Sequence, residues 1–355
     1  MILECLEKVL HRNNLIVDEA SAVMEEILSG QASTTQTAAL LISLSMKGET
    51  EEELLGMARA LRGKTYLFNQ YGPVEVGLSN VERRMLLPTS PPGELPSAAV
   101  GPAATFNIAS AVAFVVAGAG VHVLQQGHRS LNSELESAAV LDSLGINTRL
   151  ASWKIAESVA KVGLGFVFEP VISEAMEHLE FAYREIPVPT AFNLLLPMLN
   201  PGGAPGLVLG VHSAAVAETV ARVVARMGVR RAFVVHGSDG LDEITIAGTT
   251  VLAEIQDEQV QMHRIKPGDF GIPEGRLEDL EGGDARRSAE VILSVLHGEK
   301  GPWRNVVVLN AAPGIVCGGK ARNLEEGVSL AAQSIDSGRA HQVLERLAEF
   351  THQSM

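Results

Sequence analysis

The sequence predicts an α/β protein: a small helical-bundle domain, then a large domain with a mostly parallel central sheet flanked by helices. Three observations support this fold class. Residues 2–66 carry helical spacing, short β-branched runs alternate with helical stretches after residue 104, and the chain is 46% hydrophobic and 20% charged. Strands that alternate with helices are typical of parallel βαβ units, and this composition provides enough apolar surface for a large buried core.

The small helical domain is expected over residues 1–68. Apolar residues recur at three- and four-residue spacing in Val17–Leu28 and again in Ala38–Met46, which is the pattern of amphipathic helices. Gly30 follows the first stretch, where glycine commonly ends a helix, and Thr50 precedes three glutamates that favour the first turn of another. This region therefore predicts consecutive helices.

Residues 69–103 are expected to form a linker and loop. Glycine and serine are frequent there, and several prolines lie close together, namely Pro88, Pro91, Pro92, Pro96 and Pro102. Proline lacks the backbone N–H that regular hydrogen bonding requires, so this stretch is unfavourable for helices and strands. The large α/β domain is then expected over residues 104–355.

Short β-branched runs predict the strands of the large domain. These runs are Val121–Leu124, Phe166–Phe168, Leu207–Val211, Ala232–Val235 and Val306–Leu309. Residues 249–254 and 260–265 alternate around Asp257 and Glu258, which predicts a peripheral antiparallel hairpin. Residues 324–350 return to helical spacing and close the chain.

The formal net charge of −14 argues against a nucleic-acid partner, because proteins that bind phosphate backbones normally carry clustered lysine and arginine. Cys5 and Cys317 are too few and too far apart for a disulfide framework or a four-ligand zinc site, which favours a reducing cytoplasm. The N-terminus lacks the basic region of a signal peptide, and no apolar run reaches the length of a membrane span. We therefore expect a cytoplasmic protein without a membrane partner.

A predicted strand that ends in a glycine-rich turn presents two adjacent carboxylates, Asp242 and Glu243, within Val235–Ile244. Ligands of parallel α/β sheets bind at the carboxyl ends of the strands. The pair could therefore hold Mg²⁺, which prefers carboxylate and water oxygens and usually bridges to substrate phosphates. The alternative is an acidic pair in the first turn of a helix, stabilised by the helix dipole.

Six segments of the sequence match, in the same order along the chain, the motifs of a known protein family. They are Gln36–Glu53, Thr105–Ser110, Phe192–Pro201, Val235–Ile244, Lys266–Ile272 and Leu309–Ala312. In this order they resemble segments of the anthranilate phosphoribosyltransferase family, and Val235–Ile244 is very similar to the family's VHGxDGLDEI. Because so many colinear segments agree, from about residue 10 to about residue 348, the chain is identified as a divergent member or paralogue of this family. The family has the fold of glycosyltransferase family 3 and class II nucleoside phosphorylases.

The resemblance implies a pentosyltransferase of tryptophan biosynthesis, with a phosphorylated sugar donor, phosphoribosyl pyrophosphate (PRPP), and a small aromatic or amine acceptor. It also implies a homodimer formed through the helical parts, with helical contributions from about residues 171–200. No catalytic residue is assigned, because the family's reaction depends on positioning and charge neutralisation rather than on a protein nucleophile. The matching motifs suggest donor-binding residues Asn107, Ser110, Gly127 and Arg129, acceptor-binding residues Arg184 and Asn193, and the Mg²⁺ ligands Asp242 and Glu243.

The chain departs from the family's motifs at the donor site. The family's glycine-rich GTGGDG is replaced by Ser97–Pro102, whose side chains restrict close approach of the backbone to a diphosphate. The lysine of the family's KHGNR is Gln125 here, and a serine that helps to bind Mg²⁺ is Ala109. We therefore expect a divergent (phospho)ribosyl- or glycosyltransferase with an altered or weakened PRPP site. The alternative is a non-catalytic binding or regulatory paralogue.

Two residues at the predicted acceptor site, Arg184 and Glu174, could have a structural role instead of a role in binding. Arg184 could form a surface ion pair with Glu185 or Glu180, which would contribute little to stability. Glu174 would disfavour an anionic acceptor if it faces the pocket, but it could equally lie at the solvated start of a helix.

Overall fold

The computed structural model describes residues 1–64, 74–80, 105–127, 137–168, 179, 186 and 190–353. Its N-terminal part is helical, as predicted, and consists of α1 (Ile2–Leu10), α2 (Val17–Leu28), α3 (Thr34–Lys47) and α4 (Glu51–Gly63). Side chains cap two of these helices. The Ser33 hydroxyl accepts a hydrogen bond from the Gln36 amide at 3.3 Å, and the Thr50 hydroxyl accepts one from the Glu53 amide at 3.4 Å.

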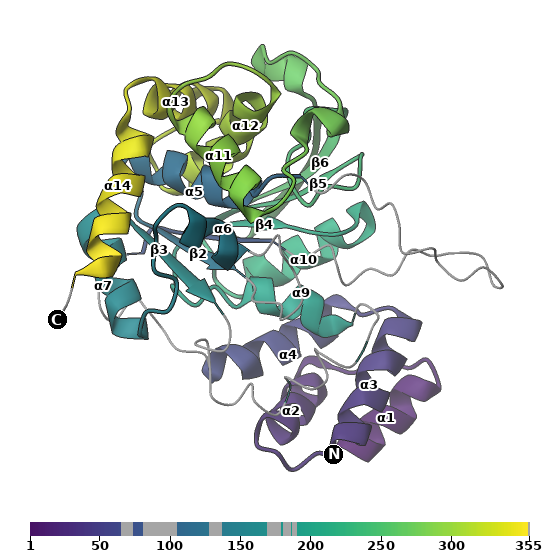
Figure 1. Cartoon of the computed structure of the whole chain (residues 1–355). Helices are drawn as coiled ribbons and strands as arrows, with labels where there is room; N and C mark the ends of the chain where they lie inside the picture. Colours follow the sequence, from purple (N-terminus) through teal and green to yellow (C-terminus); the bar gives the residue numbers. More distant parts are fainter. Residues whose placement is uncertain are drawn as a thin grey trace.

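The small helical domain is completed by a helix from much later in the chain. Helix α9 (Ala191–Met198), which lies in the range 171–200 of the predicted helical contribution, packs against α3 and α4 (Figure 1). Residues 171–178, 180–185 and 187–189 of that range lie outside the described residues. The Arg62 guanidinium of α4 donates a hydrogen bond of 2.7 Å to the carbonyl of Met227, which joins this domain to the large one.

A seven-stranded sheet forms the centre of the large domain (Figure 1). The strand order is β3-β2-β1-β4-β5-β6-β7, with parallel pairing from β3 to β5 and antiparallel pairing from β5 to β7. The strands are β1 (Val76–Asn80), β2 (Val123–Gly127), β3 (Leu164–Phe168), β4 (Gly206–Gly210), β5 (Arg231–Gly237), β6 (Thr250–Gln256) and β7 (Gln259–Ile265). The mostly parallel sheet and the peripheral hairpin of β6 and β7 are confirmed.

Strand β1 lies inside the range that we predicted as a linker, so the prediction of a loop is wrong for Val76–Asn80. The sequence Val-Gly-Leu-Ser-Asn contains residues that are depleted in strands. It is nevertheless an interior strand of the sheet, hydrogen-bonded to β2 on one side and to β4 on the other. Pairing with two buried neighbours, rather than local propensity, makes this segment a strand.

Helices cover both faces of the sheet (Figure 1). On one face, α5 (Ile108–Gly118) and α12 (Pro302–Cys317) contact the strands, and the other face packs against α9 and α10 (Ala214–Arg226). Helices α11 (Ala285–Leu296), α13 (Leu324–Asp336) and α14 (Arg339–His352) pack against α5. Two further helices, α6 (Ser137–Ser143) and α7 (Ser152–Val162), contact α11 and β3 respectively. None of the helices in the described ranges is long and apolar enough to cross a membrane.

The strand predicted at Val306–Leu309 is wrong, because these residues belong to helix α12. All four side chains are buried, as are almost all of the residues that follow them to Val316. A helix that is buried on every side has no apolar periodicity, and its β-branched run therefore looks like a buried strand. The helical tail predicted for residues 324–350 is confirmed by α13 and α14.

Candidate functional site

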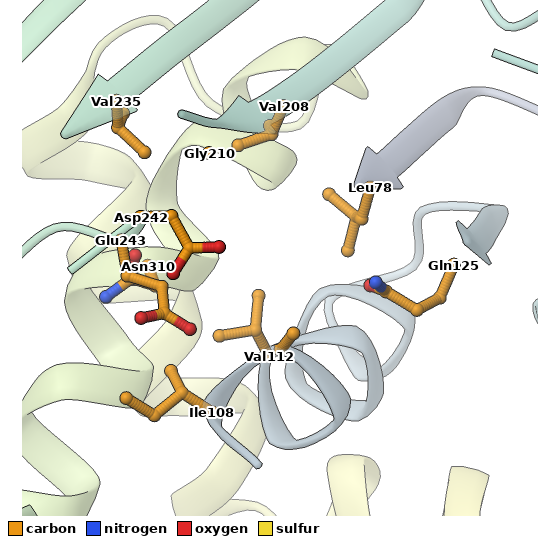
Figure 2. A pocket seen from close by; sticks show the side chains of 11 residues that line it. Leu78, Ile108, Val112, Gln125, Val208, Gly210, Val235, Asp242, Glu243 and Asn310 are labelled. Atoms are coloured by element: carbon orange, nitrogen blue, oxygen red, sulfur yellow. The ribbon is translucent and has the colours of Figure 1, made fainter. Parts of the chain in front are cut away.

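A pocket lies at the carboxyl ends of the parallel strands, beside the start of α5 (Figure 2). It is lined by Leu78, Ile108, Ala109, Val112, Gln125, Val208, Gly210, Val235, Asp242, Glu243 and Asn310. The space between them is about 340 Å³, part of which is open to solvent. Strands β2 and β3 lie on one side of β1, and β4 and β5 on the other, so the pocket spans the point where the strand order reverses. Ligands of open α/β sheets bind at this point.

Asp242 and Glu243 lie in the loop between β5 and β6. Their neighbours Leu241 and Ile244 are only 1% and 3% exposed, so these two apolar side chains hold the loop in the core while the acids line the pocket. Figure 2 shows both carboxylates on the side of the pocket that this loop forms. The two residues form a bend, and the alternative interpretation of an acidic pair in the first turn of a helix is wrong.

Asn310 of α12 makes three hydrogen bonds, and two of them hold this loop. Its Oδ1 accepts from the Ile244 amide at 2.7 Å, and its Nδ2 donates to the carbonyls of Ile244 and Val306 at 2.8 and 2.9 Å. We included Leu309–Ala312 among the matching segments but predicted no role for Asn310. The sequence did contain one indication of such a role, because Asn310 is a polar residue within an otherwise apolar stretch.

Gln125 lies on the opposite side of the pocket from the acidic loop. Its side chain is 4% exposed, and Figure 2 shows its amide directed toward the pocket. The amide nitrogen donates a hydrogen bond of 3.0 Å to the backbone carbonyl of Gln126. Ala109 also lines the pocket. Two of the departures from the family's motifs are therefore located at the pocket itself.

The predicted donor-binding residues at the start of α5 form its cap. Asn107 Oδ1 accepts a hydrogen bond of 2.9 Å from the Ser110 amide, and its Nδ2 donates one of 2.8 Å to Ser137 Oγ. Ser110 is 1% exposed. The pocket is lined instead by Ile108 and Ala109, which lie between them. Donor binding by Asn107 and Ser110 stays a prediction.

The remaining predicted residues are dispersed. Gly127 ends β2, and a Cβ added there would lie 2.5 Å from the Phe168 ring. Close packing against Phe168 therefore explains the glycine at this position. Asn193 Oδ1 accepts a hydrogen bond of 2.8 Å from the Thr190 amide at the start of α9. Arg129, Arg184, Glu174 and the segment 97–102 lie outside the described residues. The binding roles of all of these residues stay predictions.

The electrostatics of the pocket favour a hard cation together with an anionic ligand. Within the described ranges, no group of three or more His, Cys, Asp or Glu side chains could hold a metal. Two carboxylates are nevertheless sufficient for Mg²⁺, which usually keeps several waters and binds substrate phosphates as well. The N-terminus of α5 carries a partial positive charge and lies at the same pocket. The residues present therefore fit a magnesium–phosphate ligand.

A histidine near the pocket contributes no positive charge at neutral pH. His212 follows β4, and burial lowers its pKa, with a further decrease from the nearby His236. The His236 Nδ1 lies 2.9 Å from the carbonyl oxygen of Val211. Because His212 is neutral, it does not offset the negative charge of the acidic loop.

Two domain families match the chain. The helical bundle domain of a glycosyl transferase family matches residues 3–65, and the α/β domain of a glycosyl transferase family matches residues 101–341. These matches correspond to the helical domain and to most of the α/β domain described above.

Individual relatives agree with these matches. The chain is 44% identical over 351 residues to the anthranilate phosphoribosyltransferase of Pelotomaculum thermopropionicum, covering 99% of this chain and 97% of the relative. It is 40% identical to that of Geobacter sulfurreducens, covering 99% and 100%.

Solved structures show the same architecture. The crystal structure of anthranilate phosphoribosyltransferase from Thermus thermophilus superposes with a TM-score of 0.85 at 30% identity, over 98% of this chain and 99% of that one. The structure of anthranilate phosphoribosyltransferase from Saccharomyces cerevisiae in complex with PRPP and Mg superposes with a TM-score of 0.82 at 21% identity, over 99% of this chain and 97% of that one. At this identity the likeness shows the fold alone. From its domains, its site and these relatives, we conclude that the chain belongs to the anthranilate phosphoribosyltransferase family.

Proposed function

We propose that the protein transfers the phosphoribosyl group of PRPP to the amine of anthranilate, with Mg²⁺ as its cofactor. The observation that carries this proposal is the pair of carboxylates held at the pocket, where the parallel strands end. The names of the bacterial relatives support the reaction, and the yeast protein's complex with PRPP and Mg supports the cofactor.

The proposed reaction depends on positioning and on charge neutralisation. The acceptor amine forms a bond to the anomeric carbon, the bond from that carbon to pyrophosphate breaks, and the amine loses a proton to solvent. Bound Mg²⁺ would neutralise charge on the departing pyrophosphate. Asp242 and Glu243 would hold the ion, Asn310 keeps their loop in place, and the apolar side chains of Leu78 and Val112 limit access of water to the pocket.

We also infer that this donor site binds PRPP more weakly than sites that have the glycine-rich loop and the lysine. Gln125 supplies no positive charge, and Ala109 supplies no hydroxyl group, although both line the pocket. Replacing a charged hydrogen bond to phosphate would cost about 1.5–3 kcal/mol of binding. These two residues are also the observation that favours the second candidate function, a non-catalytic binding or regulatory paralogue.

The small helical domain is the proposed surface of a homodimer. Its side chains Leu3, Leu10 and Met46 are 62%, 64% and 77% exposed, and burial of exposed apolar side chains would favour association. A cytoplasmic location is proposed because Cys5 and Cys317 are both free.

Calorimetric titration of PRPP with Mg²⁺ tests the proposed function. The protein should give saturable, metal-dependent heat, and Asp242→Asn/Glu243→Gln should lose it because the metal ligands lose their charge. The matched control is Asp257→Asn/Glu258→Gln, which makes the same change in the β6–β7 turn and should bind normally. Consumption of anthranilate by the unaltered protein then tests catalysis. Binding without turnover would favour the non-catalytic paralogue, and no heat at millimolar PRPP would refute phosphoribosyl transfer.

A further inference from the structure

The side chain of Gln125 presents one oxygen that has no hydrogen-bond partner among the described residues. The backbone carbonyl of Gln126 can only accept a hydrogen bond, so the Gln125 nitrogen must face it, and this contact fixes which end of the amide is the oxygen. Oε1 is buried and has no hydrogen-bond partner among the residues that the structure describes. Buried polar atoms without partners are rare in folded proteins and need an explanation.

The neighbours of Gln125 on the sheet cannot supply the missing hydrogen bond. Leu78 of β1 and Phe166 of β3 lie beside Gln125 in register, so both side chains project from the same face, and both are apolar. Within the described part of the chain, the pocket is the remaining direction, because Gln125 lines it. The oxygen is therefore available to a molecule bound in the pocket.

The chemistry of this oxygen defines the group that it can bind. An amide carbonyl only accepts hydrogen bonds, and the oxygens of an ionised diphosphate also only accept, so the two do not pair. We propose that Gln125 is a specificity-determining residue that accepts a hydrogen bond from a ribose hydroxyl of the donor substrate. This inference rests on the proposed function. It places the diphosphate with the metal at Asp242 and Glu243, and the sugar hydroxyls across the pocket at Gln125.

Binding of two ligands separates this role from a contact with the diphosphate. PRPP with Mg²⁺ carries the ribose hydroxyls, whereas inorganic pyrophosphate with Mg²⁺ does not. Gln125→Met keeps the length of the side chain and removes the acceptor, so it should weaken PRPP binding roughly three- to tenfold, the value of one hydrogen bond, and leave pyrophosphate binding unchanged. Gln126→Met is the matched control, because that buried glutamine does not line the pocket and should leave both affinities unchanged.

A second variant keeps the proposal testable if Gln125→Met does not fold. Gln125→Asn keeps the amide but withdraws it by one methylene group, and it should also weaken PRPP binding selectively. Equal weakening of both ligands, or no change in either, would overturn the inference while the proposed function stands. Failure of the unaltered protein to bind PRPP and pyrophosphate would overturn the proposed function and the inference together.

Discussion

Replacing Asn310 by alanine should loosen the acidic loop and destabilise the protein. The substitution removes three hydrogen bonds and leaves the N–H and the carbonyl of Ile244 without this partner, next to a side chain that is 3% exposed. At about 1–1.5 kcal/mol for each bond, we expect the free energy of unfolding to fall by about 3–4.5 kcal/mol. Urea denaturation measures this change directly.

The same variant should also weaken metal-dependent binding of PRPP, roughly tenfold, because Asn310 orients the loop that carries the proposed metal ligands Asp242 and Glu243. Asn305→Ala is the matched control, since Asn305 lies on the same helix and is only partly buried. If Asn310→Ala is as stable as this control and binds PRPP equally well, burial of Leu241 and Ile244 alone holds the loop, and our reasoning about Asn310 is refuted.

Other predictions test the packing and the titration of the fold. Gly56→Ala should destabilise the protein by about 1–3 kcal/mol, because the added Cβ would lie 2.2 Å from the Val17 carbonyl, whereas Gly63→Ala, with no atom within 4 Å, should be harmless in urea denaturation. Hydrogen bonds from Lys8 and from the Ile16 amide hold the pKa of Glu19 below its usual value. These bonds therefore stabilise the folded protein fully above the ordinary glutamate pKa, and the stabilisation is lost as the pH falls through the lowered pKa of Glu19. Glu19→Gln should therefore cost about 0.5 kcal/mol of stability near neutral pH and nothing in strong acid, and a pH-independent effect would contradict this assignment. Burial raises the pKa of Cys317 to about 12, so a thiol reagent at about pH 8 should label it only after unfolding; rapid labelling of the native protein would show that the thiol is accessible.

The sequence predicted the helices and most strands because their apolar periodicity is local. It did not predict β1, whose glycine, serine and asparagine disfavour strands and whose structure depends on two neighbours distant in the chain. It also misassigned Val306–Leu309, because burial on all sides removes the periodicity that identifies a helix.

The candidate site was predictable where its residues are adjacent in sequence, as Asp242 and Glu243 are. The contributions of Asn310 and Gln125 were not, since both depend on contacts between elements. The sequence alone does not show that Asn310 of α12 hydrogen-bonds to the β5–β6 loop. Nor does it show that Gln125 Oε1 lies between two apolar side chains and has no partner among the described residues.

The interior position of β1 in the sheet also has a consequence for how the chain folds during synthesis. β1 leaves the ribosome early, but one of its two edges stays open until β4 has been made, and the helical domain likewise waits for α9. Contacts between such distant segments fold slowly, and an open strand edge can pair with other chains in the meantime. We therefore expect truncated chains that end before β4 to aggregate rather than to form a stable N-terminal half, so that the protein matures as one cooperative unit.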